Sequence, residues 1–152
     1  MAGEAPAFSA DDVINFVLEQ SGNGATRALC IGTKSQCAKA QAGFDMLVTF
    51  EIDSADLTAS ARDNLAEVAR ALGDDRLRAA RFNVEGHTDA SGEAEYNAEL
   101  SHQRAESVKR FLIENKVDDA RLVAIGRGED APRADDPLDP ANRRVELRLQ
   151  TN

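Results

Sequence analysis

Residues 82–108, FNVEGHTDASGEAEYNAELSHQRAESV, contain the stretch that decides the fold. At its start, Phe82 and Val84 alternate with polar neighbours, which is typical of a strand with one buried face. The polar, glycine-containing segment 86–89, GHTD, ends that strand. Apolar residues then recur at helical spacing over 93–115. The stretch therefore predicts a strand, a polar loop and a long helix in succession.

The predicted helix places polar side chains within its apolar stripe. The stripe is formed by Leu100, Ala105, Val108, Phe111 and Leu112. At about 100° per residue, Asn97, Ser101 and Arg104 fall within the same arc. A guanidinium facing a core needs a partner, because an unpaired buried charge costs several kcal/mol, on the order of 3 or more. Asp89, at the end of the strand, is the nearest candidate. Two interpretations stay open: a salt bridge that ties the loop to the helix, or a dipolar site for a ligand that carries an ammonium and a carboxylate.

Outward from this unit, the pattern predicts the element order β-α-β-α-β-loop-β. The predicted strands are 44–52, 81–86, 122–126 and 143–149, the helices are 58–72 and 93–115, and the proline-containing loop is 129–141. This order predicts an α+β fold, a two-layer sandwich with two helices on one face of a mixed four-stranded sheet. In the last strand, Arg143 alternates in step with Val145, Leu147 and Leu149 and therefore lies on the same face as these apolar residues. We expect its side chain to point toward the helices.

The N-terminal part predicts a short helix outside this sandwich. A Ser9–Asp12 pair resembles a capping box, and the helix is expected to end near Gln20, where the letters SGNG follow. We divide the chain into an N-terminal extension, 1–43, and a main domain, 44–152. The apolar face of the short helix either packs on the main domain or recognises an envelope protein partner.

Two cysteines, Cys30 and Cys37, enclose a six-residue loop in the extension. A disulfide between them would fit an oxidising compartment such as the periplasm. The alternatives are two thiols or half of a metal site. The only histidines are His87 and His102 and no Cys-x-x-Cys occurs, which argues against zinc.

Composition excludes several function classes. The chain has 152 residues, and its 18 Lys and Arg against 27 Asp and Glu give a net charge of −9, which is unsuited to nucleic acid and to anionic membrane surfaces. No apolar run reaches the length of a membrane span, and no signal peptide is present in the sequence.

His87 and Asp89 are not accompanied by a nucleophile elbow, a metal-ligand cluster or a phosphate loop. The sequence predicts a binding protein without a cofactor and not an enzyme.

Four separated motifs occur in a recognisable order. They are GHTDASG, YNAELSHQRAESV, IGRGEDAP and NRRVEL. Together they resemble the peptidoglycan-binding OmpA-like domain shared by OmpA, Pal-type lipoproteins and the MotB proteins of the flagellar stator. The resemblance runs from Phe44 to Leu149.

The resemblance implies a pocket that clamps the zwitterionic end of diaminopimelate in the stem peptide of peptidoglycan. In that pocket Asp89 takes the ammonium and Arg104 takes the carboxylate. The other implied members are Asn97 beside Arg104, Leu100 as the floor, Thr88 and Ser91 at the mouth, Arg143 as a second carboxylate contact, and Asp53. Asp53 stands where the family often has an Asn or a hydroxyl residue, and ordinary turn chemistry is the alternative for it. Likewise Asn97 can bond the preceding loop, and Ser91 can cap the helix.

The function implied is non-covalent anchoring of the outer membrane or of an envelope complex to the cell wall, in the periplasm. The alternative is a protein-docking domain of an envelope, secretion or flagellar assembly that does not bind the cell wall.

Overall fold

The computed structural model describes residues 6–27, 43–50, 54–130, 136, 138 and 142–150, and within them one mixed sheet forms the centre. Its strands, in spatial order, are β1 (Phe44–Asp45), β4 (Arg144–Leu149), β2 (Phe82–His87) and β3 (Leu122–Gly126). β2 and β3 are parallel, and β4 is antiparallel to both β2 and β1. The predicted mixed four-stranded sheet and its strand order along the chain are confirmed.

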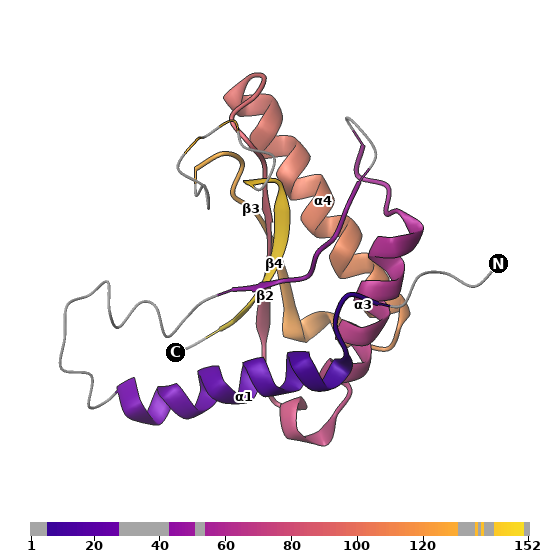
Figure 1. Ribbon diagram of the computed structural model, residues 1–152, viewed down its shortest axis with the longest axis vertical. Coiled ribbons are helices and arrows are strands. Elements are labelled where there is room, and N and C mark those ends of the chain that lie inside the picture. Colours follow the sequence, from indigo (N-terminus) through magenta and orange to yellow (C-terminus); the bar gives the residue numbers. More distant parts are fainter. Residues whose placement is uncertain are drawn as a thin grey trace.

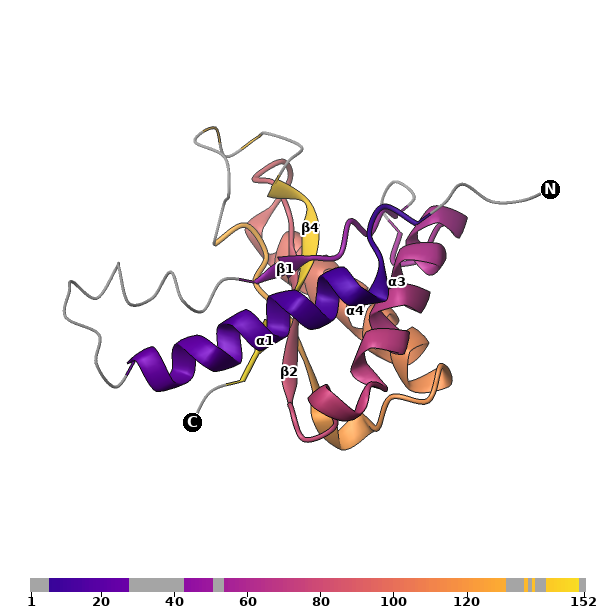
Figure 2. The ribbon, with the colours of Figure 1, turned by 60° about the horizontal axis from the view of Figure 1, so that its bottom comes forward.

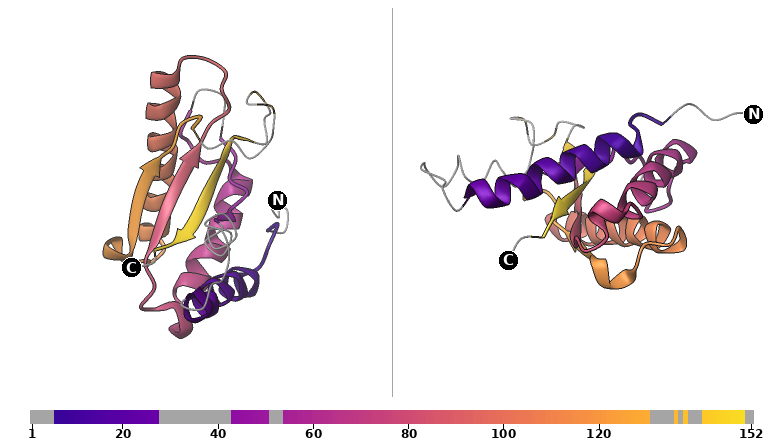
Figure 3. Two further views of the ribbon diagram at one scale, coloured as in Figure 1. Left: turned by 90° about the vertical axis from the view of Figure 1, so that its left-hand side faces the viewer. Right: turned by 90° about the horizontal axis from the view of Figure 1, so that it is seen from below.

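Two helices, α3 (Ala59–Leu72) and α4 (Ala94–Glu114), cover one face of this sheet. A third helix, α1 (Ala10–Arg27), precedes them, and two single 3-10 turns lie at η2 (Asp75–Leu77) and η3 (Asp119–Arg121). α3 and α4 lie side by side behind the strands in the left panel of Figure 3, and Figure 1 shows α4 running along the sheet. α1 packs against α3 and η2 (Figure 2). The α+β sandwich is therefore confirmed.

The core lies between the sheet and the helices and extends under α1. Its largest fully buried apolar side chains are Phe82, Met46, Leu65, Leu72, Leu77, Leu112 and Leu147. From α1, Val13, Ile14 and Val17 join the same cluster. The apolar face of α1 is thus buried against the rest of the chain, as the packing interpretation predicted, and the predicted boundary between 43 and 44 stays a prediction.

The expected end of the N-terminal helix near Gln20 is wrong, because α1 continues to Arg27. Glycine lowers helix propensity by about 1 kcal/mol relative to alanine but, unlike proline, removes no donor and introduces no clash. The segment 21–24, SGNG, can therefore remain helical when packing fixes the preceding turns of α1. No described helix is both long and apolar enough to cross a membrane.

The first predicted strand, 44–52, is also wrong in its length. β1 ends at Asp45, whose Oδ1 accepts a hydrogen bond of 2.8 Å from the backbone N–H of Leu47. Leu47 has a φ of 50°, which an extended strand cannot include. Further along the described part of the chain, Phe50 forms an isolated bridge with Leu57. The turn at Leu47 thereby places Phe50 near the end of the sheet where the site lies.

Three residues with predicted roles fall outside the described residues: Asp53, and the pair Cys30 and Cys37. The disulfide and the role of Asp53 remain predictions.

Gly86 allows a close approach between β2 and α4. A Cβ at this position would lie 2.2 Å from the backbone oxygen of Ser101. Because backbone cannot move aside as a flexible side chain can, we expect Gly86→Ala to lower the free energy of unfolding by about 3 kcal/mol. Gly73→Ala is the matched control, since its Cβ would meet no atom closer than 3.6 Å. Urea unfolding of both variants tests this, and equal stabilities would contradict it.

Candidate functional site

A cavity of about 270 Å³ opens where β2 meets the first turns of α4. We call it the Asp89 pocket; it is lined by Phe50, Thr88, Asp89, Ser91, Gly92, Tyr96, Asn97, Leu100, Arg104 and Arg143. Seven of the eight predicted site residues are among these, and the eighth, Asp53, lies outside the described residues. The structure therefore brings the predicted residues together in one concavity.

Asp89 is fixed by three contacts at the wall of this pocket. Its Oδ1 accepts hydrogen bonds from the backbone N–H of Ser91, at 2.9 Å, and from the Ser91 hydroxyl. Its Oδ2 lies 3.3 Å from Nε of Arg143. Ser91 does not cap the helix as one interpretation expected: the N-cap of α4 is Glu93, which makes no side-chain capping bond. The charged carboxylate of Asp89 is a stronger acceptor and holds the Ser91 hydroxyl.

Of the two open interpretations, the salt bridge between Asp89 and Arg104 is not among the ion pairs of the described residues. Among the described residues the ion pair of Asp89 is with Arg143. Arg104 instead donates from Nε to the backbone oxygen of Ser54, at 2.9 Å, and its guanidinium lies 4.8 Å from the centre of the Phe50 ring. The loop after β1 supplies both contacts, so it holds Arg104 away from Asp89 while both line the same pocket.

Arg143 differs from its predicted orientation. Its side chain is 53% exposed, although Val145 and Leu147 of the same parity are buried. Arg143 immediately precedes β4 and stands beyond the core, at the end of the sheet. It therefore reaches the pocket and pairs with Asp89 instead of entering the helix layer.

Asn97 and Thr88 shape the loop between β2 and α4. The Nδ2 of Asn97 donates to the backbone oxygens of Asp89, at 3.3 Å, and Ser91, at 2.8 Å, and to Glu129 Oε1. The loop-bonding role open for Asn97 is thus observed, and Asn97 also lines the pocket. The Thr88 hydroxyl is buried without a hydrogen-bond partner among the described residues.

Two aromatic residues of the pocket were missed by sequence reasoning. Phe50 was assigned to a strand, and its approach to Arg104 depends on the turn at Leu47. Tyr96, on the first turn of α4, is 48% exposed, and an exposed aromatic residue beside the polar motif was the available signal.

The face of the sheet opposite α3 and α4 carries a polar cluster. Its buried members are Glu85, His87, Arg144 and Glu146, and the partly exposed Arg127 and Arg148 lie at its edge. Alternation puts Glu85 and Glu146 on the faces of β2 and β4 opposite the apolar side chains, yet the two residues are only 2% and 7% exposed. The backbone at Gly43 packs closely over Glu146, since a Cβ at position 43 would lie 2.2 Å from the Glu146 carboxylate.

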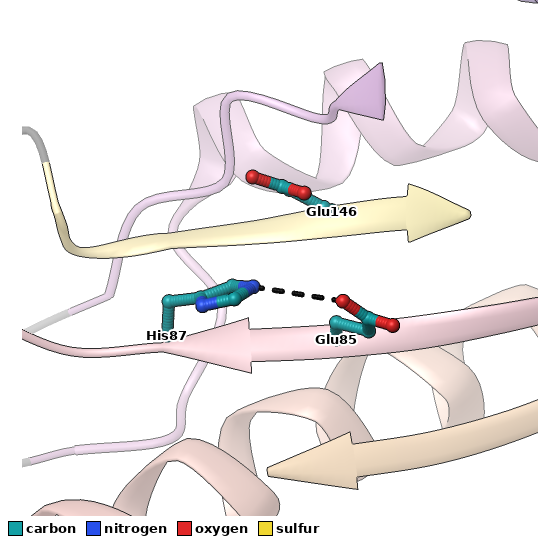
Figure 4. A group of neighbouring side chains, drawn as sticks. All are labelled: Glu85, His87 and Glu146. Carbon is teal, nitrogen blue, oxygen red and sulfur yellow. Dashed lines mark ion pairs between the residues drawn. The ribbon is translucent and has the colours of Figure 1, made fainter. Parts of the chain in front are cut away.

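Three members of the cluster have the chemistry of metal ligands. Figure 4 shows Glu85, His87 and Glu146 on one face of β2 and β4, and their ligand atoms lie within 4.8 Å of one another. Each carboxylate is however held by guanidinium groups: Glu85 by Arg127 and Arg148, both at 3.3 Å, and Glu146 by Arg144, and by Arg148 at 3.0 Å. Three arginines against two glutamates leave the cluster with charge +1 when His87 is neutral, which disfavours a cation.

Burial and the neighbouring arginines together set the protonation of His87 and Glu146. Burial is the main cause that lowers the pKa of His87 to about 4, and the charge of Arg144 acts in the same direction. Burial opposes ionisation of Glu146, but the hydrogen bond and charge of Arg144 outweigh it and lower the pKa of that carboxyl. At neutral pH His87 is therefore neutral and Glu146 is ionised.

Acid should destabilise the fold through His87. Its pKa is about 6.5 in an unfolded chain and about 4 when folded, so the unfolded state binds more protons between these values. Stability is lost as the pH falls from 6.5 to 4, by about 3 kcal/mol in total. Glu146, whose pKa is lowered, adds a further loss at lower pH, as its carboxyl becomes protonated.

Denaturant unfolding at pH 7, 5.5 and 4.5 measures this loss. His87→Gln should flatten the pH dependence above pH 4.5, while His102→Gln, at a half-exposed position on α4, should keep it. An unchanged slope in His87→Gln would contradict the assignment.

The geometry can be compared with known proteins. The profile of the OmpA family matches residues 49–146. Over 102 residues the chain is 39% identical to the peptidoglycan-associated lipoprotein of Pseudomonas putida, covering 65% of this chain and 60% of that protein. It is 38% identical over 105 residues to the probable lipoprotein YiaD of Escherichia coli K12, covering 67% of this chain and 47% of that protein. The chain thus spans less than two thirds of the length of these relatives.

Solved structures share the fold. The crystal structure of the peptidoglycan-associated lipoprotein from Burkholderia pseudomallei aligns with a TM-score of 0.60 and 32% identity, over 68% of this chain and 88% of that one. The C-terminal domain of Helicobacter pylori MotB aligns with a TM-score of 0.59 over 73% of this chain and 85% of that one, and at 22% identity it shows the shared fold alone. Because the family profile covers residues 49–146, which include α3, α4, β2 and β3, this chain belongs to the OmpA family.

Proposed function

We propose that this chain binds peptidoglycan non-covalently, through the diaminopimelate of the stem peptide, and anchors the outer membrane or an envelope complex to the cell wall in the periplasm. The region 44–152 is the binding domain in this proposal. The chain acts by binding and catalyses no reaction. The peptidoglycan-associated relatives support the class of ligand by their names.

The observation that carries the proposal is the charge arrangement of the Asp89 pocket. A buried carboxylate, Asp89, and two guanidinium groups, Arg104 and Arg143, line one cavity of about 270 Å³. The distal end of diaminopimelate is an amino-acid head group with one ammonium and one carboxylate. Asp89 would accept from the ammonium, and a planar guanidinium matches a carboxylate in a two-bond fork.

Two further features of the pocket support a polar ligand. The Thr88 hydroxyl is buried and has no hydrogen-bond partner among the described residues, so a bound head group would satisfy it. Asn97 donates to two backbone oxygens of the loop, those of Asp89 and Ser91, so the ammonium-binding wall is held in place before the ligand arrives.

Pelleting with purified sacculi tests the proposal. The chain should sediment with diaminopimelate-type sacculi and remain in the supernatant with lysine-type sacculi of equal mass. The competing function, docking to an envelope protein, predicts no sedimentation with either. The apolar face of α1 gives that alternative no support, because Val13, Ile14 and Val17 are buried. Sedimentation with neither type of sacculus would contradict the proposed function.

A further inference from the structure

A second cavity adjoins the Asp89 pocket. We call it the His87 pocket; it has a volume of about 260 Å³ and is lined by Val48, Thr49, Phe50, His87, Arg104, Arg143 and Arg144. The two cavities share Phe50, Arg104 and Arg143. Because three residues line both, the two cavities lie next to each other.

The charges of the two cavities differ. The Asp89 pocket contains a carboxylate beside its two guanidinium groups. The described lining of the His87 pocket contains three guanidinium groups and no carboxylate, since Glu146 and Asp89, the ion-pair partners of Arg144 and Arg143, do not line it. The arginines keep their charge whatever bonds they make, because a guanidinium stays protonated in proteins. The His87 pocket therefore attracts an anion, where the Asp89 pocket suits a zwitterion.

His87 is the second and independent sign of a ligand. Its side chain is 2% exposed, and neither ring nitrogen has a hydrogen-bond partner among the described residues. Its Nε2 lies 3.8 Å from Glu85 Oε1, which is too long for a hydrogen bond. A neutral imidazole has one N–H donor, and a buried donor without an acceptor is rare in native structures. An anion in the pocket would supply the acceptor.

We propose that the His87 pocket is a second subsite that takes another carboxylate of the same stem peptide, and that the α-carboxylate of the glutamate preceding diaminopimelate is the group it takes. This rests on the proposed function, because the ligand must first be held in the Asp89 pocket. The shared wall favours a carboxylate on the same molecule over a separate small anion. The remaining candidate, the terminal carboxylate of the peptide, has the same chemistry and is separated from the glutamate by the test.

Calorimetry with matched peptides tests the subsite. The ligands are an Ala-γ-Glu-diaminopimelate tripeptide, the same tripeptide with the glutamate α-carboxylate as carboxamide, and the same tripeptide with only its terminal carboxylate amidated. We expect the glutamate amide to bind about tenfold more weakly than the parent, and the terminal amide to bind like the parent. A loss confined to the terminal amide, or no difference among the three, would overturn the assignment.

A negative charge introduced at the rim of the His87 pocket tests the subsite by mutation of the protein. Thr49 is exposed and lines only the His87 pocket. Thr49→Glu should abolish the preference for the carboxylate peptide over its amide, and Thr49→Gln, which loses the same hydroxyl without adding charge, should retain it. An equal preference in both variants would contradict an anion subsite.

The two histidines allow occupancy to be observed directly. In nitrogen-15 spectra of the side chains, the parent tripeptide should shift the ring resonances of His87 and leave those of the half-exposed His102 unchanged. The glutamate amide should shift His87 much less. If acetate alone shifts His87 as the tripeptide does, the assignment to the stem peptide is wrong. If no tripeptide binds at all, the proposed function fails; if all bind equally without shifting His87, only the subsite fails.

Discussion

Asp89→Asn and Arg104→Gln should each weaken binding of a diaminopimelate stem peptide by roughly thirtyfold or more. Removing one partner of a desolvated, hydrogen-bonded charge pair costs at least about 2 kcal/mol, and 1.4 kcal/mol corresponds to a factor of ten in the dissociation constant. Asparagine keeps an oxygen that can accept from the Ser91 N–H, so Asp89→Asn preserves the loop while it removes the charge that faces the ammonium. Calorimetry with the stem peptide measures the loss.

Matched variants on α4 control for the charge change. Glu95→Gln removes one negative charge from an exposed position in its first turn, and Arg110→Gln removes one positive charge from an exposed position further along. Neither residue lines the Asp89 pocket, so both variants should bind as the unaltered chain does. Circular dichroism and thermal unfolding establish that the site variants are folded. Site variants that are folded and bind with unchanged affinity would show that the ligand lies elsewhere.

Glu146→Gln should lower the free energy of unfolding by about 3 kcal/mol. Glu146 pairs with Arg144, and both side chains are less than 10% exposed. Breaking a buried ion pair by removing one partner leaves an uncompensated buried charge, which costs about 3–5 kcal/mol. The stability is measured by urea unfolding at pH 7.

The control for this prediction is Glu106→Gln on the exposed side of α4. Glu106 lies 3.7 Å from His102, both side chains are nearly half exposed, and the change should stay within about 0.5 kcal/mol. A double replacement, Arg144→Met with Glu146→Leu, should recover much of the loss, because apolar residues of similar volume commonly replace a buried pair without cost. If Glu146→Gln is as stable as Glu106→Gln, the polar cluster does not stabilise the sheet.

The sequence alone predicts the sandwich and most of the residues that line the pocket, because both follow from patterns within short stretches of the chain. Alternation in Phe82–His87 and the helical stripe around Leu100 predict which faces are buried. The loop between them is short enough to bring Asp89 near Asn97 and Arg104. The motif resemblance then assigned roles that spacing alone left open between a salt bridge and a binding site.

The features that were missed depend on contacts between distant parts of the chain. The left-handed conformation of Leu47 carries no strong local signal, yet it ends β1 and brings Phe50 to Arg104. The Asp89–Arg143 pair joins the end of β2 to the start of β4, which are adjacent in the sheet but far apart in sequence. Alternation in β4 indicated a polar outer face, but it could not indicate that Glu85 and Glu146 are buried there by their arginine partners.

The central claim is that Asp89 and Arg104 line one open pocket for an amino-acid head group. The most direct measurement is calorimetry with two stem tripeptides that differ only in their third residue, diaminopimelate or lysine. Lysine keeps the ammonium and lacks the distal carboxylate, so we expect it to bind at least tenfold more weakly, and we expect Arg104→Gln to remove most of that difference. Equal affinity for the two tripeptides in the unaltered chain would contradict the claim.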